Sequence, residues 1–280
     1  MTDPRPVGGF DPRPVGVFDS GVGGLTVVAE LRRRMPWLDI LYFGDTARLP
    51  YGNKSPDTVR RYSLEIGRFL LAQGISHLVV ACNTSSAVAL ADIEREMPIP
   101  VLGMIGPGAK AAVEATRSGK IGLAGTRATV ASRAYEAAIE ALNPRLEVFA
   151  VACPLFVPLV EEGWSDGPVA LEIAHRYLDP VLSRGVDTLI LGCTHYPVMM
   201  PVLHQVAGPG VTLLSSAKTA VDSLEGILGE GTREASAGRI GTLASFVTDA
   251  GTHFTEIGER ILGEPIGTLT AIEEERLVVP

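Results

Sequence analysis

A succession of strands and helices occurs twice along this 280-residue chain, and each copy ends in a cysteine. Each copy runs from an apolar strand through a glycine-containing loop, a helix, a second strand, a proline-containing loop and another helix to a strand that ends in cysteine. The first copy spans Val15–Cys82 and the second spans Lys120–Cys193. Short apolar runs that alternate with helical patterns are typical of mainly parallel sheets flanked by helices. The pattern therefore predicts an α/β fold with two similar lobes.

Individual elements follow from local patterns. The helix expected over 55–73 has Ser55 as its cap, Pro56 in its first turn and Gly74 after its end. Pro180 is expected to kink or divide the helical pattern around 171–183. The expected strands are short apolar runs, most of them bounded by Gly, Asp or Pro: Val15–Phe18, Ile40–Phe43, His77–Ala81, Lys120–Leu123, Leu146–Val151 and Thr188–Leu191.

The repeat also predicts how the chain divides. We expect one lobe to contain residues 1–106 and 216–280 and the other to contain 107–215, with hinges near 105–108 and 214–217. Ligands of parallel α/β sheets bind beyond the carboxyl ends of the strands. Two lobes that turn these ends toward each other would place the active site in the cleft between them.

A near-repeat of eight residues lies at the N-terminus. Residues 3–10 read DPRPVGGF and residues 11–18 read DPRPVGVF, and they differ only at Gly9 and Val17. The second copy runs into an apolar strand and so belongs to the fold. The first copy is rich in proline and has no apolar partner, so 1–10 is predicted to be a flexible tail.

Composition limits the class of protein. The formal net charge is -8, from 24 Lys and Arg against 32 Asp and Glu, which argues against a nucleic-acid partner. No apolar run reaches the roughly 18–20 residues of a membrane helix, and no secretory signal precedes the fold. Three cysteines, an odd number, do not suggest a set of paired disulfides, so we expect the reducing environment of the cytoplasm. The sequence contains no CxxC or HExxH pattern, so no metal site is predicted.

The cysteines that end the two copies have matching polar surroundings. Cys82 precedes the polar run NTSS and a helical pattern, and a helix N-terminus favours a thiolate. Cys193 precedes Thr-His-Tyr, where the imidazole of His195 can exchange a proton with the thiol. Cys153 lies in the apolar segment VACPLF and is predicted to be an ordinary buried cysteine. Cys82 and Cys193 are therefore the predicted reactive pair.

Two loops supply further polar groups. Asp19 and Ser20 enter a glycine-rich loop whose N–H groups can approach a small carboxylate, although its spacing matches no nucleotide-binding motif. Asp19 either takes part in proton transfer or caps the next helix. In YFGDTARLPYGNKS, the turn at 50–52 can present N–H groups to a substrate. Asp45 and Arg48 of the same segment are expected only to pair with each other on the surface.

Taken together, these segments resemble the glutamate racemases of the aspartate/glutamate racemase family. The resemblance extends from about Val15 to the C-terminal region and is densest in GVFDSGVGGLTV, YFGDTARLPYG, ACNTSSA and GCTHYP. It implies a cofactor-independent enzyme that needs neither pyridoxal phosphate nor metal. It also implies interconversion of L- and D-glutamate by two cysteines, a homodimer, and a supply of D-glutamate for peptidoglycan.

The resemblance assigns roles to particular residues. Cys82 would act on the α-proton of D-glutamate and Cys193 on that of L-glutamate. Asp19 would assist the first thiol, and His195 would assist the second. The side chains or backbone groups expected to hold the substrate belong to Ser20, Pro50, Tyr51, Gly52, Asn83, Thr84 and Thr194.

One further acidic residue is expected near the second cysteine. In the segment VPLVEEG both Glu161 and Glu162 fit this place, and the resemblance favours Glu161. Three other functions fit the same residues. They are racemisation of another acidic amino acid such as aspartate, a hydrolase or decarboxylase that uses one cysteine, and a protein that binds an acidic ligand or a protein partner without catalysis.

Overall fold

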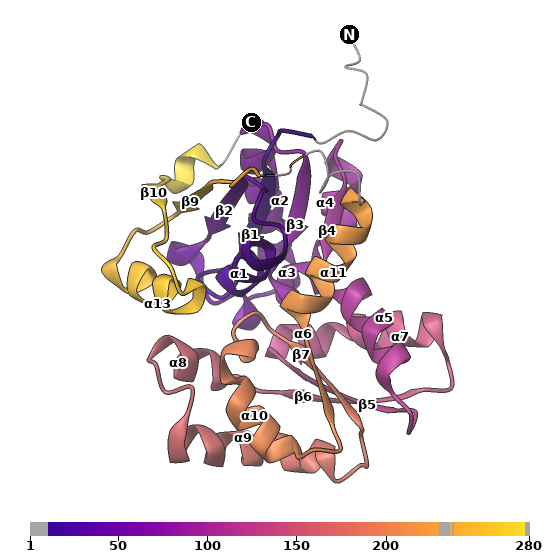
Figure 1. The fold of residues 1–280 in the computed structure, drawn as a ribbon. Helices are drawn as coiled ribbons and strands as arrows, with labels where there is room; N and C mark the ends of the chain where they lie inside the picture. Colours follow the sequence, from indigo (N-terminus) through magenta and orange to yellow (C-terminus); the bar gives the residue numbers. More distant parts are fainter. Residues whose placement is uncertain (1–10, 230–235, 237, 278–280) are drawn as a thin grey trace.

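Two separate parallel sheets form the framework of the molecule (Figure 1). The computed structural model describes residues 11–229, 236 and 238–277, so the predicted tail at 1–10 lies outside the described residues. The first sheet contains, in spatial order and among these residues, β10 (Thr268–Ala271), β9 (Leu243–Val247), β2 (Ile40–Gly44), β1 (Val15–Asp19), β3 (His77–Val80) and β4 (Val101–Gly103). The second contains β6 (Glu147–Ala152), β5 (Lys120–Gly125), β7 (Thr188–Gly192) and β8 (Thr212–Ser215).

All the strand pairs are parallel, which confirms the predicted sheet type. In β1, Val15 lies opposite Ile40 on one side and His77 on the other. Because both faces of a parallel sheet are covered, its central strands are apolar throughout rather than alternating. All five residues of β1 and of β7 are accordingly buried.

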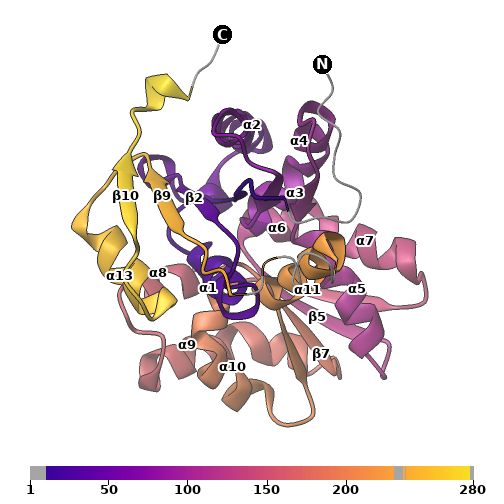
Figure 2. The same cartoon turned by 45° about the horizontal axis from the view of Figure 1, so that its top comes forward.

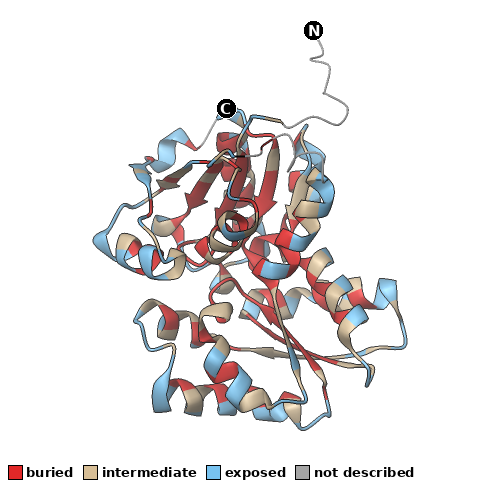
Figure 3. Ribbon diagram, viewed as in Figure 1, coloured by how far each residue is buried: buried red, intermediate tan, exposed pale blue. Residues whose placement is uncertain are grey.

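Each sheet is covered on both faces by helices that complete separate apolar clusters (Figures 1 and 2). The first sheet packs against α1 (Leu25–Arg34), α11 (Ser216–Leu228) and α13 (Thr252–Leu262) on one face and against α2 (Pro56–Ala72) and α4 (Leu90–Glu96) on the other. The second sheet packs against α8 (Phe156–Glu161), α9 (Gly167–Leu182) and α10 (Met200–Ala207) on one face and against α5 (Ile105–Ala115) and α7 (Ala134–Leu142) on the other. The buried residues of Figure 3 accordingly concentrate on the strands and on the inner sides of these helices.

The remaining helical segments are short and lie beside the strand ends. They are α3 (Asn83–Val88), α6 (Arg127–Ser132), and the 3-10 turns η1 (Thr46–Arg48), η2 (Tyr51–Asn53), η3 (Tyr196–Met199) and η4 (Glu274–Arg276). None of the described helices is long and apolar enough to span a membrane.

The chain leaves the first sheet after β4 and returns to it after β8. The helices that begin at these crossings, α5 and α11, pack against each other between the sheets. These helices begin at Ile105 and Ser216, within the ranges 105–108 and 214–217, and a hinge at either place stays a prediction. The limits of the two lobes in sequence, 1–106 with 216–280 and 107–215, stay a prediction.

Two local predictions about helices have different outcomes. Helix α2 begins and ends as expected, and the Ser55 side chain accepts a hydrogen bond from the backbone N–H of Thr58 at 3.3 Å. The predicted division at Pro180 is wrong, because α9 continues as one helix to Leu182. Its Pro180 removes only the hydrogen bond that the missing N–H would donate to the carbonyl of Arg176, and a kink at this position stays a prediction.

The buried stripe of α2 provides a test of packing. Replacing the fully buried Ile66 with Ala should reduce the free energy of unfolding by about 2–5 kcal/mol, because it removes apolar contacts and leaves a cavity. The matched change Arg61→Ala, at an exposed position on the same helix, should cost less than about 0.5 kcal/mol. Urea unfolding followed by circular dichroism measures both values. Equal losses in the two variants would contradict the assignment of this core.

Candidate active site

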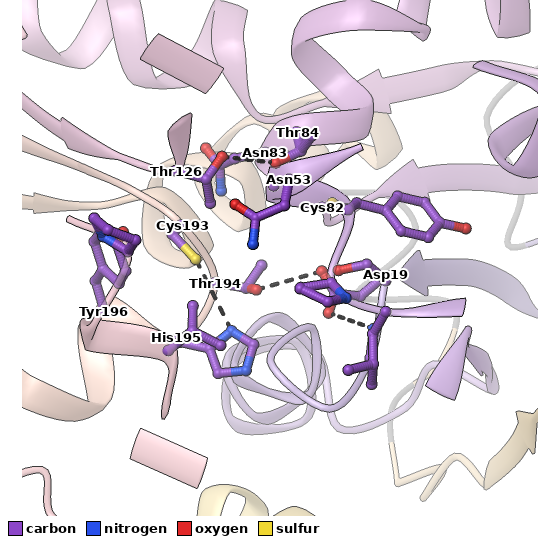
Figure 4. A pocket seen from close by; sticks show the side chains of 18 of the residues that line it. Asp19, Asn53, Cys82, Asn83, Thr84, Thr126, Cys193, Thr194, His195 and Tyr196 are labelled. Atoms are coloured by element: carbon purple, nitrogen blue, oxygen red, sulfur yellow. Dashed lines mark hydrogen bonds between the residues drawn. The ribbon is translucent and has the colours of Figure 1, made fainter. Parts of the chain in front are cut away.

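A cavity of about 180 Å³ lies between the carboxyl ends of the two sheets (Figure 4). All the residues predicted as catalytic or substrate-binding line it, although they come from both repeats. These are Asp19, Ser20, Pro50, Tyr51, Gly52, Cys82, Asn83, Thr84, Glu161, Cys193, Thr194 and His195. The volume is below the range of about 300–1,000 Å³ that is usual for drug-sized ligands, so the cavity suits a small metabolite.

Cys82 lies at the N-terminus of α3, as its sequence surroundings predict. It is the capping residue, and its Sγ accepts a hydrogen bond from the backbone N–H of Ser85 at 3.4 Å. This contact favours a thiolate, but burial and then the negative charge of Asp19 outweigh it and raise the pKa of Cys82 to about 11. The helix N-terminus therefore acts in the expected direction but does not by itself determine the protonation state of Cys82. Its sulfur is protonated at neutral pH.

Asp19 connects the first lobe to the second. Its Oδ2 accepts a hydrogen bond from the backbone N–H of Gly21 at 3.1 Å, and its Oδ1 accepts one from the Thr194 hydroxyl at 3.3 Å. Burial raises the pKa of this carboxyl against the opposing effect of the His195 charge. A Cβ on Gly24 would lie 2.4 Å from the Asp19 Cβ, so only glycine fits there. Asp19 thus faces the cavity and is no simple helix cap.

His195 is placed between Cys193 and an acidic residue of α8. Its Nδ1 lies 3.9 Å from the Cys193 Sγ, and its Nε2 lies 3.0 Å from Oε1 of Glu161. Burial alone would lower the pKa of His195, but the contacts to Cys193 and Glu161 raise it to about 10. The imidazole is therefore protonated at neutral pH. A cation next to a sulfur stabilises negative charge on that sulfur.

The two acidic residues at the end of α8 differ in position. Glu161 is partly buried and lines the cavity, where it contacts His195. Glu162 is exposed and follows the helix as its C-terminal cap. Of the pair left open by the sequence, Glu161 is the one whose carboxylate reaches the site. Cys153 is buried in the core of the second sheet, as predicted.

The predicted surface pair Asp45–Arg48 is instead a buried cluster behind the cavity. The Arg48 guanidinium donates to both carboxylate oxygens of Asp45 at 2.8 and 2.9 Å and also pairs with Glu65. Tyr51 donates its hydroxyl to Asp45, so its side chain is committed to the first lobe. Buried charges persist only when they are paired. The cluster therefore anchors the loop that carries Pro50 and Gly52, and it leaves that loop's backbone to face the cavity.

Several cavity residues come from the loop after β5, which the sequence analysis missed. The hydroxyls of Thr84 and Thr126 lie 2.9 Å apart, and Thr84 and Thr129 lie 3.3 Å apart, so threonines from both lobes meet. Arg127 also lines the cavity. The internal repeat of the sequence could have predicted that this loop lies at the cavity. The loop after β5 follows the first strand of the second repeat, just as the Asp19 loop follows the first strand of the first repeat. The other unpredicted lining residues are Gly21, Leu49, Asn53, Pro154, Val157, Pro158 and Tyr196.

Comparison with known proteins gives consistent results. Residues 26–224 match the family model described as Asp/Glu/Hydantoin racemase. The glutamate racemase of Geobacter metallireducens is 48% identical over 256 residues, which cover 91% of this chain and 95% of the relative. The chain belongs to the glutamate racemase family. Its resemblance to glutamate racemases is thereby confirmed, and so is its class as an isomerase.

Solved glutamate racemase structures show the same fold. An isoform from Bacillus anthracis superposes with a TM-score of 0.88 at 38% identity and covers 94% of this chain and 98% of its own. The enzyme from Francisella tularensis, in complex with D-glutamate, superposes with a TM-score of 0.86 at 34% identity and the same coverage of both chains. The two-lobed α/β architecture of this racemase is therefore that of its family.

The contact between Glu161 and His195 predicts the protonation of the imidazole. Glu161→Gln should lower the pKa of His195, because a neutral amide no longer stabilises the imidazolium. Glu162→Gln, which removes the same charge one residue away, should leave it unchanged. Titration of the His195 ring by NMR measures both. Because the pKa of His195 is raised to about 10 in the folded protein, the imidazolium stabilises the fold, and this stabilisation is lost as the pH rises through that value. In Glu161→Gln the loss should occur at a lower pH.

Proposed function

We propose that this chain interconverts L- and D-glutamate by proton transfer between the α-carbon and two thiols on opposite sides of the cavity. The observation that carries the proposal is that Cys82 and Cys193 end corresponding strands of the two repeats and face one cavity from different lobes. Racemisation requires removal of a proton from one face of a carbon and delivery of another to the opposite face. Two bases on opposite sides perform this without turning the substrate.

The charges around each sulfur support a direction for the first half of the cycle. Cys193 lies beside an imidazolium, whereas Cys82 lies beside the Asp19 carboxyl and has a raised pKa. We propose that the half-cycle starts with Cys193 as the thiolate and Cys82 as the thiol. The Cys193 thiolate takes the α-proton of L-glutamate, and the Cys82 thiol gives its proton to the opposite face. D-glutamate leaves, and the two sulfurs have exchanged protonation states.

Asp19 and His195 would allow the enzyme to work in the other direction. When Cys82 gives up its proton, Asp19 can take up and return a proton next to it, and its raised pKa suits this task. His195 can likewise supply a proton to Cys193 while Glu161 holds the imidazole in place. Each thiol thus has its own proton donor and acceptor.

The greater part of the barrier lies in the weak acidity of the α-proton. A carbanion-like state can be stabilised by oriented donors in a site that excludes water. Ser20, Gly52, Thr84 and Thr194 line the cavity and can supply such donors from their N–H groups and hydroxyls. We propose that these groups, together with Pro50, Tyr51 and Asn83, hold the two carboxylates and the ammonium group of the substrate. The complex of the Francisella tularensis relative with D-glutamate supports glutamate as the ligand.

We further propose that the enzyme acts in the cytoplasm as a homodimer and supplies D-glutamate for peptidoglycan, without pyridoxal phosphate or a metal. These points rest on the family resemblance. We also propose that the lobes move relative to each other about hinges at the starts of α5 and α11. These two helices pack against each other, which keeps the two crossings close together.

The reaction itself is tested by incubating the purified protein with L-glutamate in deuterated water and without added cofactor. Optical rotation should decay to zero while deuterium enters the α-position, because the enantiomers have equal free energy and the equilibrium constant is one. Polarimetry and proton NMR follow both processes. No change with either enantiomer of glutamate, together with turnover of aspartate, would move the assignment to that substrate.

Serine substitutions test the use of both cysteines. Cys82→Ser and Cys193→Ser should each reduce kcat for both enantiomers, by on the order of 10²–10⁴-fold, because a hydroxyl is a far weaker acid than a thiol. Cys153→Ala is the matched control, since that buried cysteine lies outside the cavity, and it should keep most of the activity. A variant that loses one cavity cysteine and remains fully active would indicate a one-cysteine enzyme.

A further inference from the structure

Beyond the residues assigned above, we infer that Tyr135 positions the turns of both catalytic cysteines through a single buried phenol. The inference rests on the proposed function, because it concerns the geometry of that reaction. Tyr135 does not line the cavity and is completely buried in the second lobe, in the first turn of α7. It is therefore a positioning residue that acts through its neighbours.

The hydroxyl of Tyr135 reaches across the lobes to the first cysteine turn. It donates a hydrogen bond of 2.8 Å to Oδ1 of Asn83, the residue that follows Cys82. The other end of the same amide donates from Nδ2 to the Ser216 hydroxyl at 3.2 Å. Asn83 is only 2% exposed and lines the cavity. Two partners from different elements thus fix the rotation of a side chain that faces the proposed substrate.

The ring of Tyr135 lies against the second cysteine turn. A Cβ on Gly192, the residue before Cys193, would lie 3.3 Å from the ring Cε2. A Cβ on Gly108, in helix α5 at the crossing, would lie 3.0 Å from the ring Cε1. A Cβ at either position would crowd the ring, and at Gly192 it would also meet Leu123 and Ala124 at 2.9 and 3.1 Å, so the two glycines let the backbone approach the ring closely. The phenol therefore touches the strand end that carries Cys193 and the helix that begins at one crossing.

The backbone before Tyr135 is shaped for this contact. Helix α6 ends at Ser132, and Arg133 adopts a left-handed conformation with φ of 55° before α7 begins. Such a conformation is uncommon for residues other than glycine and costs free energy. The left-handed residue separates α6 from α7, and Tyr135 stands two residues after it in the core of the second lobe. Burial and then the charge of Cys193 raise the pKa of Tyr135, which keeps the hydroxyl protonated as a donor.

These contacts link Tyr135 to four residues beside the cysteine turns and the crossings. The hydroxyl orients Asn83, and through Asn83 it reaches Ser216 at the start of α11, while the ring supports Gly192 and Gly108. Removing only the hydroxyl leaves the packing of the ring intact. It also leaves a buried amide oxygen of Asn83 without its donor, which is costly in a closed site. The unpaired oxygen lowers the stability of the fold, and the loss of one of its two partners also frees the Asn83 amide to rotate beside the cavity, so we expect an effect on catalysis in addition to the effect on stability.

The variant Tyr135→Phe tests this. Its kcat/KM should fall by roughly tenfold or more, because Asn83 is no longer held in one orientation beside the substrate, and equally for both enantiomers because the equilibrium constant stays at one. The melting temperature should change by only a few degrees. The matched control is Tyr177→Phe in the same lobe, whose hydroxyl makes no hydrogen bond with the described residues, and its kcat/KM should stay within twofold of wild type.

A double-mutant cycle separates positioning from a general structural role. Tyr135→Phe and Ser216→Ala both release the Asn83 amide, so their combined effect on kcat/KM should be clearly smaller than the product of the single effects. Multiplicative losses that follow the melting temperature would overturn the inference. A Tyr135→Phe variant with wild-type kcat/KM would overturn it as well. A wild-type protein that does not racemise glutamate would instead overturn the proposed function, and the inference with it.

Discussion

The hydrogen bond from Thr194 to Asp19 joins the two lobes at the place where their strand ends meet. The backbone carbonyl of Thr194 accepts a second bond across the lobes from the Thr26 hydroxyl at 2.9 Å. Because the strands of both sheets are parallel, all their carboxyl ends lie on one edge, and these contacts turn the two edges toward each other. The loops that carry Cys82 and Cys193 then have no other place to point than the shared cavity. The enclosed site is thus a consequence of strand direction and a few hydroxyl contacts.

The repeat predicts similar lobes, but the electrostatics of the two cysteines differ. A buried carboxyl stands beside Cys82, and a buried imidazole with its own carboxylate partner stands beside Cys193. The two enantiomers have equal free energies, but the two half-reactions need not be alike. Only the free-energy change summed over the complete catalytic cycle must be zero. Unequal neighbours allow one sulfur to be charged and the other neutral at the same pH. Two identical surroundings would favour the same protonation state for both thiols.

The sequence predicted the parts of the fold that depend on local patterns. Buried central strands such as β1 and β7 are continuous apolar runs, and the expected limits agree with the observed ones to within one or two residues. Four strands were missed. The strand β4 has three residues, β8 and β10 lie at sheet edges and are only partly buried or exposed, and β9, next to β10, has only two buried residues among its five. The buried cluster of Asp45, Arg48 and Glu65 was missed because its partners come from separate elements. No local pattern records that three charged residues will be enclosed together.

Residues that line the cavity and residues that stand behind it differ in how far a sequence can predict them, and Tyr135 shows why. Residues that touch substrate follow the strand ends, so polar residues after apolar runs identify them. Positioning residues stand behind them, and their sequence surroundings are those of any helix. Tyr135 occupies the segment AYEAAIEAL, which resembles an ordinary amphipathic helix. Only the three-dimensional structure brings its hydroxyl to Asn83 and its ring to Gly192. Two lobes that contribute one reactive sulfur each need such a shared support, since small changes in lobe orientation alter the position of each sulfur relative to the substrate.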